Sequence, residues 1–88
     1  MTRERFDEIR QRITENDEDV IAALNRRLEL VTELWRLKDE LGLEVADPGR
    51  EQRLRAHLAE TNTGPLTREG LDEIVTVLLD LTKRELGA

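Results

Sequence analysis

Cysteine is absent from the sequence, and several other residue types are scarce. Without cysteine there is no disulfide framework, thiol nucleophile or thiolate metal site, so the composition suits a reducing compartment. His57 is the single histidine, and we expect neither a metal nor a cofactor. With one tryptophan, one phenylalanine, no tyrosine and a net charge of -6, the chain offers no platform for stacking bases, so nucleic acid is not an expected partner.

Long apolar runs are also missing. The opening Met-Thr-Arg-Glu-Arg has no apolar segment behind it, and no stretch approaches the roughly 20 apolar residues of a membrane-spanning helix. We therefore expect a cytoplasmic protein with no signal peptide and no contact with a membrane. A length of 88 residues predicts a single domain, 1–88, near the lower size at which a lone chain buries enough apolar surface, so help from a partner is expected.

The clearest pattern in the sequence lies between Phe6 and Leu41. Residues at alternating steps of four and three from Phe6 onward predict a long helix whose stripe faces other helices. The stripe comprises Phe6, Arg10, Ile13, Asp17, Val20, Leu24, Arg27, Val31, Leu34, Lys38 and Leu41. Charge at positions that face other helices costs free energy unless it is paired, so Arg10, Arg27 and Lys38 indicate a site for an anion.

Helix geometry separates these three cations. Arg27 and Lys38 would lie within about 20° of the same helix face and about 16 Å apart along the axis, so their side chains can enclose a small anion. Arg10 would lie about 25 Å before Arg27 and about a quarter-turn away. It therefore cannot serve the same pocket within one chain, although it can serve the pocket of a symmetry mate.

Three helices are predicted, and the fold class is all-α, because no segment alternates apolar and polar residues as a strand does. The first helix is expected over residues 3–41, since neither proline nor glycine interrupts it and Gly42 can end it as a left-handed cap. Asp47 is interpreted as the N-cap of a second helix, 48–60, with Pro48 at its first position.

The third helix is expected over residues 67–86, with Thr67 as its cap. At 1.5 Å per residue the first helix would be about 57 Å long, whereas the other two would reach about 18 and 30 Å. One chain cannot cover its own stripe with such short partners. The lengths therefore predict a two-fold dimer in which the long helices run antiparallel.

The charged positions resemble those of the all-helical chorismate mutases, short intertwined dimers that convert chorismate to prephenate. The resemblance lies in Ile9-Arg10-x-x-Ile13-x-x-x-Asp17, Leu24-x-x-Arg27, Lys38 and Asp47-Pro48-x-Arg50-Glu51. It covers nearly the whole chain. It implies three helices per chain, an intertwined six-helix homodimer, and an isomerase of aromatic amino-acid biosynthesis that needs no cofactor.

The resemblance also implies roles for the cations. Arg27 and the neighbouring chain's Arg10 would bind one substrate carboxylate, and Arg50 would help to hold the second. Arginine suits this task because its planar guanidinium makes bidentate contacts with carboxylates. Lys38 would donate to the ether oxygen, where negative charge grows during the rearrangement.

The other site positions match the family to different degrees. By resemblance, Glu51 and the backbone near Asp47 would fix the ring hydroxyl of the substrate, although Asp47 serves equally well as a cap. Thr82 aligns with a serine of the family, whereas Leu86 aligns with a glutamine or glutamate and cannot donate a hydrogen bond. The tail 84–88 resembles the intracellular actinobacterial branch, whose members are modest catalysts until the first enzyme of the shikimate pathway binds them, which implies such a regulatory complex here.

Two alternatives stay open. A sister enzyme on the same scaffold, acting on 4-amino-4-deoxychorismate or eliminating pyruvate from isochorismate, differs little in sequence, because Glu51 can face a hydroxyl or an amine. A non-catalytic helical dimer that regulates a partner enzyme is favoured by Leu86 and opposed by the retained cations. Arg53 and Arg55 are interpreted as parts of an ordinary solvated helix face.

Overall fold

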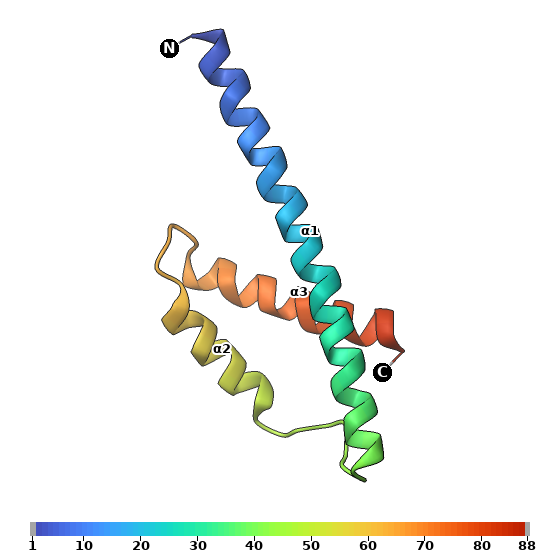
Figure 1. Ribbon diagram of the computed structural model, residues 1–88. Coiled ribbons are helices and arrows are strands. Elements are labelled where there is room, and N and C mark those ends of the chain that lie inside the picture. The colour runs from blue at the N-terminus through green and yellow to red at the C-terminus, as the bar shows by residue number, and fades with distance from the viewer. Residues whose placement is uncertain (1, 88) are drawn as a thin grey trace. The chain divides into compact units, whose positions relative to one another are not determined.

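The computed structural model describes residues 2–87 and forms three helices (Figure 1). They are α1 (Arg3–Glu40), α2 (Arg50–Thr61) and α3 (Arg68–Leu86). Residues 2–87 contain no strand, so the predicted all-α class is confirmed. The chain divides into two compact units, residues 1–34 and 35–88.

The first unit is helical from Arg3 onward. The Thr2 hydroxyl accepts a hydrogen bond from the Arg5 amide at 3.1 Å, which satisfies one of the amides that a helix start leaves unpaired. An ion pair one turn apart, Arg3 with Asp7 at 3.5 Å, supports the first turns. The large apolar side chains that follow are 37 to 58% exposed; they are Phe6, Ile9, Ile13, Val20 and Ile21.

At its other end α1 stops at Glu40, one residue before the predicted end, in a Schellman motif. The Gly42 amide donates to the Asp39 carbonyl at 3.1 Å, and the Leu43 amide donates to the Lys38 carbonyl at 2.7 Å. Gly42 has a φ of 71°, so the left-handed cap predicted from the sequence is confirmed. These bonds satisfy carbonyls that the end of the helix would otherwise leave without donors.

Replacing Gly42 with alanine is expected to lower the free energy of unfolding by about 1 kcal/mol, because a Cβ disfavours the left-handed conformation. Urea denaturation followed by circular dichroism measures the change. Gly64→Ala is the matched control, since Gly64 has no positive φ and a Cβ there meets no atom within 4 Å. Equal losses in the two variants would show that the left-handed cap at Gly42 is not the cause.

The start of α2 differs from the prediction. Asp47 is not its N-cap, and Pro48 is not its first residue; α2 begins at Arg50, and its N-cap is Gly49, with φ 86° and ψ -13°. The Arg50 amide donates to the Asp47 carbonyl at 3.0 Å, which closes a β-turn over Pro48 and Gly49. Proline followed by a left-handed glycine is the sequence signature of a type II turn, and this turn delays the helix by two residues.

α3 begins as predicted. The Thr67 side chain accepts a hydrogen bond from the Gly70 amide at 3.0 Å, so its assignment as N-cap is confirmed. The buried side chains of α3 are Leu71, Val75 and Thr82, which are four and seven residues apart and therefore share one face. Together they form the centre of the second unit.

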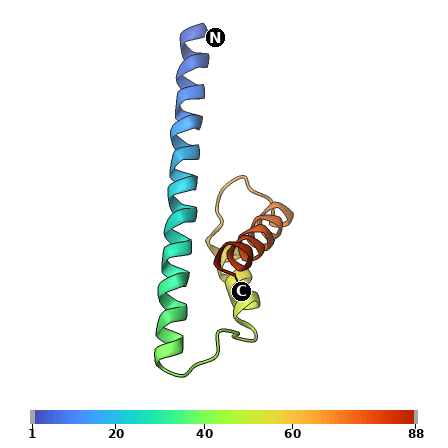
Figure 2. The same ribbon diagram turned by 90° about the vertical axis from the view of Figure 1, so that its right-hand side faces the viewer.

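α2 and α3 are consecutive helices that contact each other (Figures 1 and 2). α2 contributes Leu54, Leu58 and Ala59, all half-buried, from one side of the helix. In the connecting loop, the Asn62 side-chain amide donates to the Leu66 carbonyl at 2.8 Å. This hairpin carries much of the predicted site.

Candidate active site

Lys38 lies in the last turn of α1, within the second unit, and its side chain is half-buried. Its Nζ donates a hydrogen bond to the Val45 carbonyl at 2.9 Å, while its own carbonyl accepts from the Leu43 amide. A positive charge suits this position, because the C-terminal end of a helix carries partial negative charge. An ammonium has three donors, so the bond to Val45 orients Lys38 and leaves further donors for a ligand.

Asp47 and Arg50 lie on either side of the Pro48–Gly49 turn. An Asp47 Oδ1 atom pairs with Arg53 Nη2 at 3.2 Å, and both side chains are well exposed. Arg50 is exposed at the first position of α2, and within residues 2–87 its guanidinium forms no ion pair. A cation opposes the helix dipole there, which favours an anionic ligand for Arg50.

Glu51 lies in the first turn of α2 and is held by Arg55, one turn later. Arg55 Nη2 donates to Glu51 Oε1 at 3.1 Å. The interpretation of Arg55 as an ordinary solvated residue is wrong, because its side chain is only 22% exposed and also binds α3. The sequence signal that was available is the Glu-to-Arg spacing of four residues on one helix.

The two predicted positions on α3 differ in environment. Thr82 is buried, and its hydroxyl donates to the Leu78 carbonyl at 2.7 Å, so the proton points along the helix. Leu86 is the last residue of α3 and half-buried. A hydrocarbon side chain gives no donor at that position, as expected from its chemistry.

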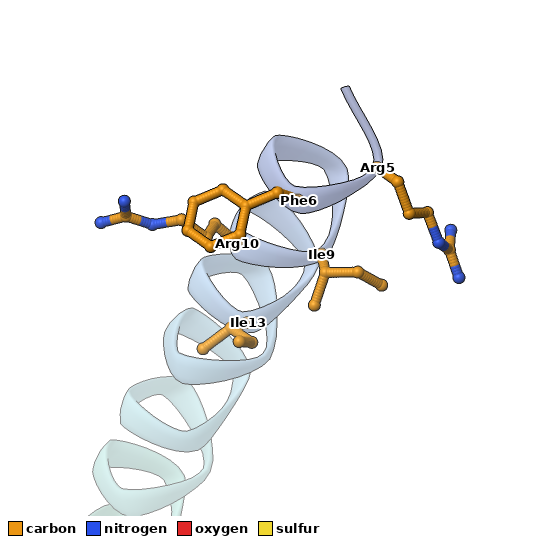
Figure 3. Close-up of a pocket in the computed structure, with 5 residues that line it drawn as sticks. All are labelled: Arg5, Phe6, Ile9, Arg10 and Ile13. Atoms are coloured by element: carbon orange, nitrogen blue, oxygen red, sulfur yellow. The ribbon is translucent and has the colours of Figure 1, made fainter. Parts of the chain in front are cut away.

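The other two predicted site residues, Arg10 and Arg27, belong to the first unit. Arg27 is half-buried and engaged in an interaction. The Arg10 guanidinium lies 5.5 Å from the centre of the Phe6 ring, a cation–π contact that restrains the long side chain. Figure 3 shows the Phe6 and Arg10 side chains on the same side of α1 and the Arg5 side chain on the other.

A shallow pocket of about 410 Å³ surrounds this contact on α1. Its lining residues are Arg5, Phe6, Ile9, Arg10 and Ile13 (Figure 3). Most of this surface is apolar, so by itself it does not suit a doubly charged ligand. A single helix face with exposed isoleucine side chains suits packing against another helix.

Residues 2–87 meet neither the requirements of a metal site nor those of a membrane-spanning helix. Residues 2–87 hold no group of three or more histidine, cysteine or acidic side chains placed to bind a metal ion. No helix within residues 2–87 has the length and apolar character needed to cross a membrane.

The comparisons with known proteins agree with the resemblance. Residues 9–85 match the family described as chorismate mutase type II. The fold is similar to that of a chorismate mutase (form I) from Thermus thermophilus, with a TM-score of 0.81 and 29% sequence identity over 89% of this chain and 98% of that one. Among curated proteins, none matches. Because the family match extends over most of the sequence, the chain belongs to the type II chorismate mutases.

Proposed function

We propose that this chorismate mutase converts chorismate to prephenate in a site shared between two copies of the chain. The family match over residues 9–85 and the similarity to a solved chorismate mutase support the activity. The observation that carries the proposed site is the Lys38 ammonium, held at the end of α1 by the Val45 carbonyl. The Lys38 ammonium is thus an oriented donor at the end of α1, just before the loop that leads to Asp47.

The reaction is a Claisen rearrangement, in which the ether C–O bond breaks while a new C–C bond forms within one molecule. No nucleophile, general base or metal is required, because the electrons move in a single cyclic step. The protein must hold the pseudo-diaxial conformer with its reacting carbons close together. It must also stabilise the negative charge that grows on the ether oxygen.

Lys38 would meet the second requirement. One of its three donors is engaged by Val45, and another would bind the ether oxygen of chorismate. Since the bond to Val45 already restricts the flexible side chain, less entropy is lost when the substrate binds. This preorganisation is the feature that makes a donor effective against developing charge.

The substrate carboxylates would be held by arginines. Arg27 and the partner subunit's Arg10 would bind one carboxylate, and Arg50 would help to bind the other. Bidentate contacts with planar guanidinium groups fix orientation as well as charge. The exposed, unpaired position of Arg50 within residues 2–87 supports its availability for an anion.

Glu51 and the backbone near Asp47 would bind the ring hydroxyl, and Thr82 would contribute its hydroxyl oxygen. Leu86 would leave the ether oxygen with one donor fewer than in relatives that carry glutamine or glutamate there. Loss of one such donor lowers a rate by roughly 100-fold or more. The chain alone would therefore be a modest catalyst, and the resemblance of the tail 84–88 to the actinobacterial branch implies activation by the first enzyme of the shikimate pathway.

A homodimer is proposed because α1 exposes its apolar side chains. No residue of Arg3–Glu40 is buried, although this helix carries isoleucine, leucine and phenylalanine along its stripe. A second copy running antiparallel would cover that stripe and bring Arg10 to the opposite site. Burial of this apolar surface is the expected driving force for association.

Incubation with chorismate, 4-amino-4-deoxychorismate and isochorismate in separate reactions tests the activity. We expect prephenate from chorismate, identified by mass spectrometry and by its acid-catalysed conversion to phenylpyruvate. Rapid pyruvate release from isochorismate, with chorismate unchanged, would instead show the lyase. A non-catalytic regulator would turn over none of the three and would show no saturable binding of a dicarboxylate transition-state mimic.

A further inference from the structure

Arg55 connects α2 to α3 through two hydrogen bonds and makes a third within α2. Its Nη1 donates to the Asp72 carbonyl at 3.0 Å, and its Nη2 donates to Thr76 Oγ1 at 2.8 Å and to Glu51 Oε1 at 3.1 Å. The Asp72 carboxylate lies 3.7 Å from Nη1 and adds charge complementarity. Arg55 is thus fixed by contacts with a neighbouring helix, which an ordinary surface pair lacks.

The hydrogen-bond directions in this cluster are set. Thr76 Oγ1 donates its proton to the Asp72 carbonyl at 3.0 Å, so its oxygen lone pair is left to accept from Arg55. A guanidinium is planar and presents its N–H groups in a rigid fork. Since Nη1 and Nη2 each bond to α3, the orientation of the second Nη2 hydrogen, which is donated to Glu51, is determined.

Glu51 is held on one side only. Arg55 engages Oε1, while Oε2 has no hydrogen-bond partner among residues 2–87 and the side chain is 56% exposed. Because only one of its two acceptor oxygens is engaged by the protein, the Glu51 carboxylate keeps the other to accept from a ligand donor. The bonds to α3 also restrict Arg55 more than an ion pair between residues four apart on one helix would do by itself.

We propose that Arg55 is a positioning residue: anchored on α3 by Asp72 and Thr76, it holds one oxygen of Glu51 so that the other binds the ring hydroxyl of the substrate. This inference rests on the proposed role of Glu51 in chorismate binding. Arg55 would touch no substrate atom and would act only through Glu51. Its contribution should therefore disappear when Glu51 can no longer act.

A double-mutant cycle tests this dependence. Arg55→Gln is expected to lower kcat/KM about tenfold in the otherwise natural chain, but less than about twofold in a Glu51→Gln background, because contacting residues that act together are not additive. Both kcat and KM are measured with chorismate at one pH, and circular dichroism checks that each variant is folded. Should Arg55→Gln fail to fold, Arg55→Lys takes its place, since it keeps the charge but its single nitrogen cannot occupy the positions of both Nη1 and Nη2.

Arg68→Gln is the matched control. Arg68 also pairs with Asp72, at 3.6 Å, but is well exposed and does not contact Glu51, so kcat/KM should change less than about twofold in either background. Equal losses for Arg55→Gln in both backgrounds would overturn the proposal and indicate a purely structural tie. A loss for Glu51→Gln with none for Arg55→Gln would also overturn it while leaving the proposed function intact. No effect of Glu51→Gln alone would remove Glu51 from the site and refute the role of Arg55, whereas no turnover of chorismate by the natural chain would refute the proposed function itself.

Discussion

Replacing Lys38 with alanine is expected to lower kcat by about 100-fold to 1,000-fold, the effect of removing about 3 to 4 kcal/mol of transition-state stabilisation. The physical reason is that negative charge grows on the ether oxygen as the C–O bond breaks, and Lys38 is the proposed donor to it. Stopped or continuous assays of chorismate disappearance at saturating substrate measure kcat directly.

The fold should survive this change, because the Schellman bonds at the end of α1 use main-chain atoms of residues 38, 39, 42 and 43, and alanine at position 38 keeps its own carbonyl. Unchanged circular dichroism would show this. Lys83→Ala is the matched control, since Lys83 is an exposed lysine in the last turn of α3. A Lys38→Ala variant that keeps a near-normal kcat would remove Lys38 from the chemistry.

Mixing two impaired variants is expected to restore activity. In Arg10→Ala every proposed site lacks the cation supplied by the other subunit, and in Lys38→Ala every site lacks its ether-oxygen donor. A heterodimer of the two contains one site with both residues intact. With random exchange, about half of the dimers are mixed and half of their sites are complete, so about one quarter of the natural activity should return.

The experiment requires subunit exchange, by co-expression or by joint refolding, followed by the chorismate assay. Arg27→Ala mixed with Lys38→Ala is the matched control, because the proposal places these two residues in the same site on the same chain. That mixture should regain nothing, since neither subunit of the heterodimer offers both side chains. Recovery in both mixtures, or in neither, would contradict the supply of Arg10 across the interface.

Much of the fold follows from local rules that the sequence displays. The long apolar stripe predicted α1, Gly42 predicted its end, and Thr67 predicted the start of α3, because each signal depends on residues within one or two turns. The start of α2 was mistaken because Pro48 satisfies two rules at once. Proline suits the first position of a helix and the second position of a turn, and only the glycine after it decides for the turn.

The site is less accessible to sequence reasoning. Lys38 could be selected from charge and spacing, and Glu51 from the resemblance to the family, but their neighbours could not. Arg55 is bound to Asp72 and Thr76, which are 17 and 21 residues away in the chain, and no periodicity within α2 indicates that contact. Likewise, nothing in the sequence predicts that the Val45 carbonyl accepts from Lys38, because every residue has such an oxygen.

That last contact has a practical consequence for mutagenesis. Since all amino acids supply the same peptide oxygen, replacing the side chain of Val45 leaves the acceptor for the Lys38 ammonium in place. A conventional alanine scan would therefore pass over a position that helps to orient the proposed donor to the ether oxygen. Revealing it calls for altered covalent chemistry, such as an ester in place of the amide after Val45, assembled by ligation of synthetic fragments.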